Sequence, residues 1–209
     1  RIGNFNKGSM EGGKIIYPDG HAIIEEFSSE LGFGISIVKE IILPDGQKIY
    51  PRPKDVCTAV NFLLKEWESN FTNINSGELS ETDIYECLYN IWDADADSYI
   101  NTNVEGMDGK LHNEFSAEIY RPGNYVHTKT KYDELCKKLS SCTINSLAKG
   151  TSLKLVTKIN KQPEEEKFEK TASFFTIPVY PGKKYNPQVR LMARSTISGY
   201  LITLDIIAK

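Results

Sequence analysis

The spacing of the apolar residues changes along the chain, and the order of these changes constrains the fold more than any other feature. In the first 50 residues, β-branched runs flank two Pro-Asp-Gly turns. After Pro53 the apolar residues recur every three or four positions, and after Thr151 the period becomes two. Strands, then helices, then strands are typical of an α+β fold rather than of alternating α/β units.

We therefore expect a single α+β domain over residues 1–209, in which N-terminal β-hairpins and two to three amphipathic helices pack on a C-terminal antiparallel sheet. A chain of 209 residues has the length of one generous domain. A soft seam is expected near residues 107–123, between an acidic helical part and a basic strand-rich part.

The two turns, Pro18-Asp19-Gly20 and Pro44-Asp45-Gly46, each predict a tight hairpin. Proline presets φ, aspartate bonds back to the main chain, and glycine takes the left-handed position. A strand is expected between the turns over residues 34–38. Residues 1–14 are rich in Gly and Asn and lack an apolar period, which predicts an arm or loop.

Three helices are expected, and each starts at a recognisable signal. The first begins after Asp55, the second after Ser80 in a capping-box pattern, and the third after Thr130. Their apolar stripes contain, in chain order, Val56, Cys57, Ala59, Val60, Leu63, Leu64, Trp67 and Phe71; then Ile84, Cys87, Leu88, Ile91 and Trp92; then Tyr132, Leu135, Cys136 and Leu139.

The period of two after Thr151 predicts four antiparallel strands, over residues 153–159, 168–180, 189–194 and 200–207. The last of them has one charged residue, Asp205, and is expected to be an edge strand that can add to a neighbour's sheet.

The expected core combines the helical stripes with these strands. Its members are Val56, Val60, Leu63, Leu64, Trp67, Ile84, Leu88, Ile91, Trp92, Leu135, Leu155, Phe175, Leu191, Leu201 and Leu204.

Charge is divided unevenly along the chain. Residues 1–119 carry 9 Lys or Arg against 21 Asp or Glu, and residues 120–209 carry 16 against 7, so a net charge of −3 conceals parts of −12 and +9. Oppositely charged parts can steer partners or pack head to tail. The first functional hypothesis is therefore a non-enzymatic structural or assembly protein. It would form a homo-oligomer, or dock on a protein partner, through complementary charged faces and an edge strand.

A second hypothesis follows from cations and aromatic residues among the C-terminal strands. Antiparallel strands that carry both are suited to single-stranded nucleic acid, because phosphates take the charge and bases stack on the rings. The candidate residues for a polyanion or a partner are Lys154, Lys158, Lys183, Lys184, Arg190, Arg194, Tyr180 and Tyr185.

An acidic segment resembles a calcium loop of the EF-hand type over about 12 residues. Asp93, Asp95 and Asp97 occupy the first three acidic positions of that pattern, but Ser98 replaces its glycine and Val104 stands where a bidentate Glu belongs. Without that last ligand the loop offers too few oxygens to bind a hard cation tightly, so we expect a solvated acidic turn and no cofactor. A calcium site at these three aspartates is the alternative.

No arrangement of residues specifies a reaction. The histidines are scattered, and phosphate-loop and metalloprotease motifs do not occur, so no catalytic residue is assigned and an enzyme is not expected. No apolar run approaches the roughly 18 residues of a membrane span, so no membrane partner is expected.

The four cysteines are too sparse for a disulfide scaffold. We expect them to be reduced and structural, as in an intracellular protein, and Cys136 and Cys142 are the pair favoured in an oxidising compartment. One N-glycosylation sequon, Asn70-Phe71-Thr72, is present and does not decide the compartment.

Overall fold

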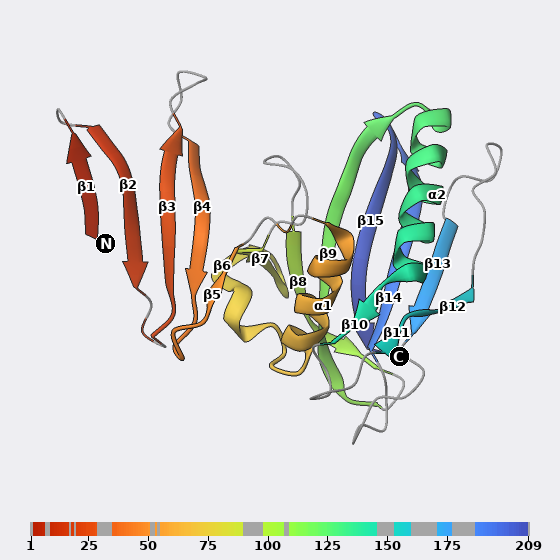
Figure 1. Cartoon of the computed structure of the whole chain (residues 1–209), viewed down its shortest axis with the longest axis horizontal. Coiled ribbons are helices and arrows are strands. Elements are labelled where there is room, and N and C mark those ends of the chain that lie inside the picture. Colours follow the sequence, from red (N-terminus) through yellow and green to blue (C-terminus); the bar gives the residue numbers. More distant parts are fainter. Residues whose placement is uncertain are drawn as a thin grey trace.

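The computed structural model of the chain (Figure 1) contains two antiparallel sheets, a two-stranded ribbon and two helices among the residues that it describes. These are residues 2–6, 9–16, 18, 20–28, 35–50, 53, 55–89, 98–106, 109–145, 153–159, 171–176 and 187–208.

The N-terminal sheet has five strands in chain order: β1 (Ile2–Asn6), β2 (Ser9–Ile16), β3 (Ala22–Ser28), β4 (Ile35–Ile42) and β5 (Lys48–Ile49). The larger sheet has eight strands, in the spatial order β12 (Val156–Ile159), β13 (Thr171–Thr176), β14 (Pro187–Thr196), β15 (Gly199–Ala208), β9 (Leu111–Gly123), β8 (Ser98–Glu105), β7 (Ile84–Cys87) and β6 (Asn75–Glu81). The ribbon pairs β10 (Thr143–Ile144) with β11 (Leu153–Lys154). The α+β prediction is confirmed at this coarse level, although the share of strand exceeds the expectation.

Both predicted hairpins are confirmed. Ile16 pairs with Ala22 across the first turn, and Ile42 pairs with Lys48 across the second. In the second turn the Asp45 carboxylate accepts the Gln47 N–H at 2.8 Å, and Gly46 has a φ of 84°. The predicted N-terminal arm is wrong, because residues 2–6 and 9–16 form β1 and β2. Main-chain pairing along these two strands needs no apolar period.

The first predicted helix is confirmed as α1 (Val56–Trp67), followed by a short 3₁₀ turn, η1 (Thr72–Ile74). The Asp55 carboxylate caps α1 by accepting the Thr58 N–H at 2.9 Å. The helix is shorter than its apolar stripe, because Asn70 and Phe71 take φ values of 54° and 58° and turn the chain away.

The second predicted helix is wrong, because its described residues belong to the end of β6, the turn after it, and β7 with the two residues that follow. Asp83, with a φ of 61°, reverses the chain between β6 and β7, and Tyr85 then pairs with Ile100 of β8. The strand makes Ile84 and Leu88 half-buried rather than core residues. Ile91 and Trp92 lie outside the described residues.

The third predicted helix exists as α2 (Tyr125–Ser141) but begins earlier than expected. The side chain of Asn124 accepts the His127 N–H at 2.9 Å and so supplies the cap that starts the helix.

The four C-terminal strands are confirmed as neighbours, β12 to β15, but the predicted edge strand is wrong. β15 pairs with β14 on one side and with β9 on the other, where Ile206 lies opposite Phe115. β9 runs through residues of the expected seam, and its alternation of Phe115, Ala117 and Ile119 with polar residues is a strand pattern that the sequence analysis did not use.

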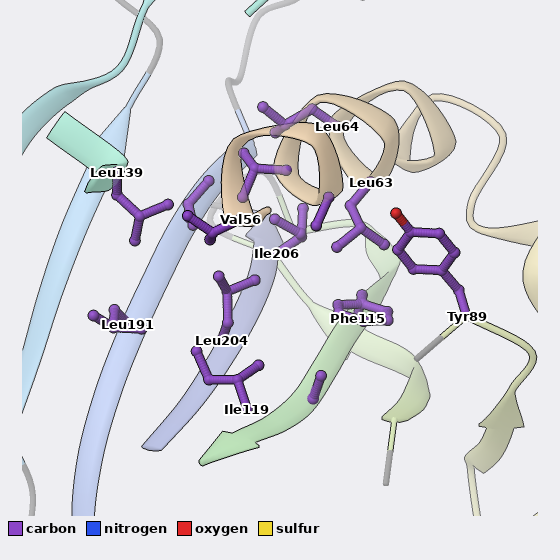
Figure 2. Close-up of a cluster of buried hydrophobic side chains, with 14 of the residues drawn as sticks. Val56, Leu63, Leu64, Tyr89, Phe115, Ile119, Leu139, Leu191, Leu204 and Ile206 are labelled. Atoms are coloured by element: carbon purple, nitrogen blue, oxygen red, sulfur yellow. The ribbon is translucent and has the colours of Figure 1, made fainter. Parts of the chain in front are cut away.

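Helices α1 and α2 both cover one face of the eight-stranded sheet, and the core lies between these layers (Figures 1 and 2). Leu63 of α1, Phe115 of β9 and Leu204 of β15 are fully buried there. Complete burial of such a side chain is worth about 1.5–3 kcal/mol. The predicted core residues found buried are Val56, Val60, Leu63, Leu64, Trp67, Leu135, Leu155, Phe175, Leu191, Leu201 and Leu204.

A disulfide joins Cys57 of α1 to Cys142 at the end of α2. The two Cα atoms are 5.3 Å apart, although 85 positions separate the residues in sequence. The prediction of four reduced cysteines is therefore wrong, and so is the Cys136–Cys142 pair, because the start of α1 lies beside the end of α2. Cys87 and Cys136 are free thiols.

Candidate assembly edge

The N-terminal sheet is a single layer over most of its area. In Figure 1 no described helix or strand lies over β1, β2 or the upper parts of β3 and β4. Other parts of the molecule approach this sheet near the β2–β3 and β4–β5 turns, which lie side by side. The edge strands of such a sheet present unpaired main-chain N–H and C=O groups that can pair with another chain.

One apolar row attaches this sheet to the body of the molecule. The register places four isoleucines opposite one another on successive strands: Ile15, Ile23, Ile41 and Ile49. The last three are buried in the main core cluster and Ile15 packs against it. The row therefore fixes which face of the sheet meets α1 and the larger sheet.

The opposite face of the same sheet is partly exposed and partly charged. Ile16 is 57% exposed there. Lys48 and Glu40 form an ion pair of 3.0 Å between β5 and β4, and the Glu40 carboxylate raises the pKa of Lys48. This ion pair places charged groups at the β5 edge of the sheet.

The two larger sheets end in four edge strands, and three of them carry features that oppose pairing with another chain. β5 has only two residues and includes Lys48, β12 has four and includes Lys158, and β6 contains two glutamates and pairs irregularly with β7. Short length, charge and irregular pairing each oppose edge-to-edge association.

The fourth edge, β1, differs from the others in charge, although it is also short and its pairing with β2 also shifts register between Asn4 and Phe5. Its sequence, Ile2-Gly3-Asn4-Phe5-Asn6, has no charged residue and no proline. In the described part of the chain β1 pairs with β2 only, so every second residue directs its main-chain N–H and C=O away from the sheet. We name residues 2–6 the β1 edge. The sequence alone does not reveal this edge, because an edge is defined by the order of strands in the sheet.

Among the predicted polyanion residues, Arg190 already has a partner. Arg190 Nε donates to Asp205 Oδ2 at 2.8 Å, and Ser116 Oγ donates to Asp205 Oδ1 at 2.6 Å. Asp205 is 2% exposed and lies between Leu204 and Ile206, whose side chains face the helices. The pair therefore occupies the other face of the sheet and joins β14, β15 and β9.

The remaining predicted residues are not gathered at one place in the described structure. Arg194 is exposed on β14, and Lys154 is exposed on the separate ribbon. Lys158 belongs to β12, but its side chain lies outside the described part of the structure. The other members, Lys183, Lys184, Tyr180 and Tyr185, lie outside the described residues, as do the predicted metal ligands Asp93, Asp95 and Asp97.

Two properties of the described titratable groups bear on their chemistry, namely their clustering and their pKa values. They include no group of three or more His, Cys, Asp or Glu side chains that could hold a metal ion. Burial raises the pKa of Cys87 to about 12, and burial also raises the pKa of Cys136, so both thiols stay protonated at neutral pH. Burial raises the pKa of Glu66 as well, and that carboxylate accepts hydrogen bonds from Asn73 and Ser69.

A groove of about 630 Å³ lies between β5 and α1. Tyr50, Phe62 and Tyr89 form much of its apolar lining, and the rings of Phe62 and Tyr89 are 4.5 Å apart. The groove carries both signs of charge, Lys48 and Asp55, and so favours no class of charged ligand.

No known protein family, curated protein or solved structure matches this chain. In the residues described, no helix is both long enough and apolar enough to cross a membrane.

Proposed function

We propose that this protein is a non-enzymatic assembly protein that forms a homo-oligomer by pairing the β1 edge of one copy with the β1 edge of a second. The observation that supports this proposal is the contrast among the four sheet edges, of which β1 alone has neither charge nor proline. Antiparallel pairing of identical edges is a two-fold, self-complementary contact that closes as a dimer.

The sequence of the β1 edge suits antiparallel pairing with itself. With Asn4 opposite Asn4 of the second copy, Gly3 lies opposite Phe5 and Ile2 opposite Asn6. An aromatic residue opposite a glycine compensates for the missing side chain. No like charges face each other in this register.

The charge distribution along the chain also permits this contact. Residues 1–50 carry 5 Lys or Arg against 7 Asp or Glu, whereas residues 51–119 carry 4 against 14. The acidic excess thus belongs to later parts of the chain, and repulsion between two N-terminal sheets is small. A five-residue edge adds about five hydrogen bonds, each worth about 0.5–1.5 kcal/mol net, so the dimer should dissociate on dilution.

Sedimentation analysis across a concentration series tests this proposal. The mass should rise from 23.6 kDa toward twice that value, and Asn4→Lys should shift the equilibrium to monomer, because it places two cations opposite each other. Asn4→Thr is the matched control and should still dimerise. A mass of 23.6 kDa at every concentration, or unchanged association of Asn4→Lys, would contradict the proposal.

Salt separates this mode of assembly from association through the acidic and basic parts of the chain. Contacts between exposed charges weaken as the Debye length falls from about 10 Å at 0.1 M to about 3 Å at 1 M salt. Pairing of the uncharged β1 edges should persist at 1 M salt. Loss of the oligomer at high salt would instead favour head-to-tail association by charge.

A further inference from the structure

We propose that Asn70 is a site of N-linked glycosylation. This proposal does not depend on the β1 edge and concerns the turn that follows α1. It rests on the exposure of the sequon, on the hollow beside it, and on the disulfide between α1 and α2.

The sequon Asn70-Phe71-Thr72 lies in the turn that follows α1, and both of its functional residues are exposed. Phe71 alone is buried, with 0% exposure, and anchors the turn in the core. Asn113 Nδ2 donates to the main-chain carbonyl of Asn70 at 3.0 Å, so this contact holds the turn through the backbone and leaves the side-chain nitrogen uninvolved.

A hollow of about 360 Å³ adjoins the Asn70 side chain. Its lining residues include the polar Thr72, Asn75 and Asn113 as well as His21 and Pro18, and apolar atoms make up the larger part of its exposed surface. Amide and hydroxyl groups of this kind can hydrogen-bond the hydroxyl groups of a first sugar. A glycan on Asn70 would extend from an exposed position of the turn beside this hollow.

The disulfide supplies the independent observation about the compartment. Disulfides such as Cys57–Cys142 form and persist in oxidising compartments, including the endoplasmic reticulum, where chains with an exposed sequon meet the glycosylation machinery. The disulfide and the exposed sequon therefore fit the same oxidising compartment.

The modification is a group transfer without redox change. The donor is a lipid-diphosphate-linked oligosaccharide, supplied with its transferase by the compartment. Asn70 Nδ2 forms a bond to the anomeric carbon and loses one proton, while the bond from that carbon to the diphosphate oxygen breaks and the lipid diphosphate leaves with the electron pair.

Expression of the full chain behind a secretion signal in a eukaryotic cell tests the proposal. The secreted protein should have a mass above the 23.6 kDa of the chain, and peptide-N-glycosidase should remove the excess and convert Asn70 to Asp. Thr72→Ala should abolish the modification. Thr72→Ser, which keeps the sequon and a hydroxyl that can donate to Ser69 O as Thr72 does at 2.6 Å, should retain it.

Asn70→Gln provides a second unmodified variant, and peptide mapping without reductant establishes that each secreted variant contains the Cys57–Cys142 bond. Secreted, disulfide-linked protein with unmodified Asn70 would overturn the proposal. Equal modification of the Thr72→Ala and Thr72→Ser variants would overturn it as well.

Discussion

The two sheets of this molecule are held in different ways. The eight-stranded sheet has two helices over one face, a buried core between the layers, and edges that are short, charged or irregular. The five-stranded sheet has one row of isoleucines against the body, and its outermost strand is uncharged. The eight-stranded sheet is stabilised by packing between layers, whereas in the proposed dimer the N-terminal sheet would be extended by a second copy at its β1 edge.

The variant with the largest expected loss of stability creates a cavity in the core between the helices and the eight-stranded sheet. Phe115 on β9 is fully buried beneath α1, so Phe115→Ala should lower the free energy of unfolding by about 3–5 kcal/mol. Urea denaturation measures the change. Ile16→Ala on the exposed face of the N-terminal sheet is the control, with an expected change within about 0.5 kcal/mol. Similar losses in the two variants would contradict the description of two unequal regions.

Removal of the cross-link should have the next largest effect. Replacement of both Cys57 and Cys142 by Ala should cost about 2–4 kcal/mol, because the open chain has more conformational freedom when unfolded. Reductant should lower the stability of the parent protein by a similar amount and leave the double variant unchanged. Cys87→Ala, which keeps the bond, should respond to reductant like the parent.

The ion pair between Arg190 and Asp205, on the face of the sheet opposite the helices, should have an intermediate effect on stability. Asp205→Asn leaves the Arg190 guanidinium without its carboxylate, and the expected cost is about 1–3 kcal/mol because Arg190 is still partly exposed. Thermal unfolding measures it. Arg194→Gln, at an exposed position of the same strand, should change stability by less than about 0.5 kcal/mol. Equal effects would mean that the pair contributes nothing specific.

A smaller change probes the attachment of the N-terminal sheet. Ile41→Val shortens one buried side chain of the isoleucine row and should cost about 0.5–1.5 kcal/mol, confined to that sheet. Hydrogen exchange should accelerate for amides of β3 and β4 and stay unchanged in β14 and β15. Faster exchange in both sheets would show that they unfold as one unit.

The smallest expected effect is at the start of α1, which links the two regions. The Thr58 N–H lowers the pKa of the Asp55 carboxylate, so this cap stabilises the fold above the unfolded pKa and the gain is lost as the pH falls through the folded pKa. Asp55→Ala should cost about 0.5–1 kcal/mol at neutral pH and nothing in acid. Asp55→Asn, which keeps an acceptor, should lose less. A cost for Asp55→Ala that persists in acid would exclude this role.

Local signals in the sequence predicted the elements that depend on local physics. The Pro-Asp-Gly turns, the stripe after Asp55 and the alternation after Thr151 each became the expected structure. The stripe at residues 84–92 failed because its spacing fits a helix, but a left-handed Asp83 and pairing with β8 make a strand of its first part.

Features that join distant parts of the chain could not be predicted from local signals in the sequence. The contact between Cys57 and Cys142 requires knowledge of how α1 lies beside α2, and the interior position of β15 requires knowledge that β9 pairs with it. The β1 edge was hidden for the same reason. Its five uncharged residues became a candidate surface only once the strand order placed them at the end of a sheet.

The bond between Cys57 and Cys142 also determines how the molecule responds to mechanical force. Tension applied at the two ends passes through this bond, so the chain between the two cysteines, including β6 to β9, stays out of the loaded path. With 85 positions between them, about 300 Å of contour length remains hidden until a reductant opens the loop.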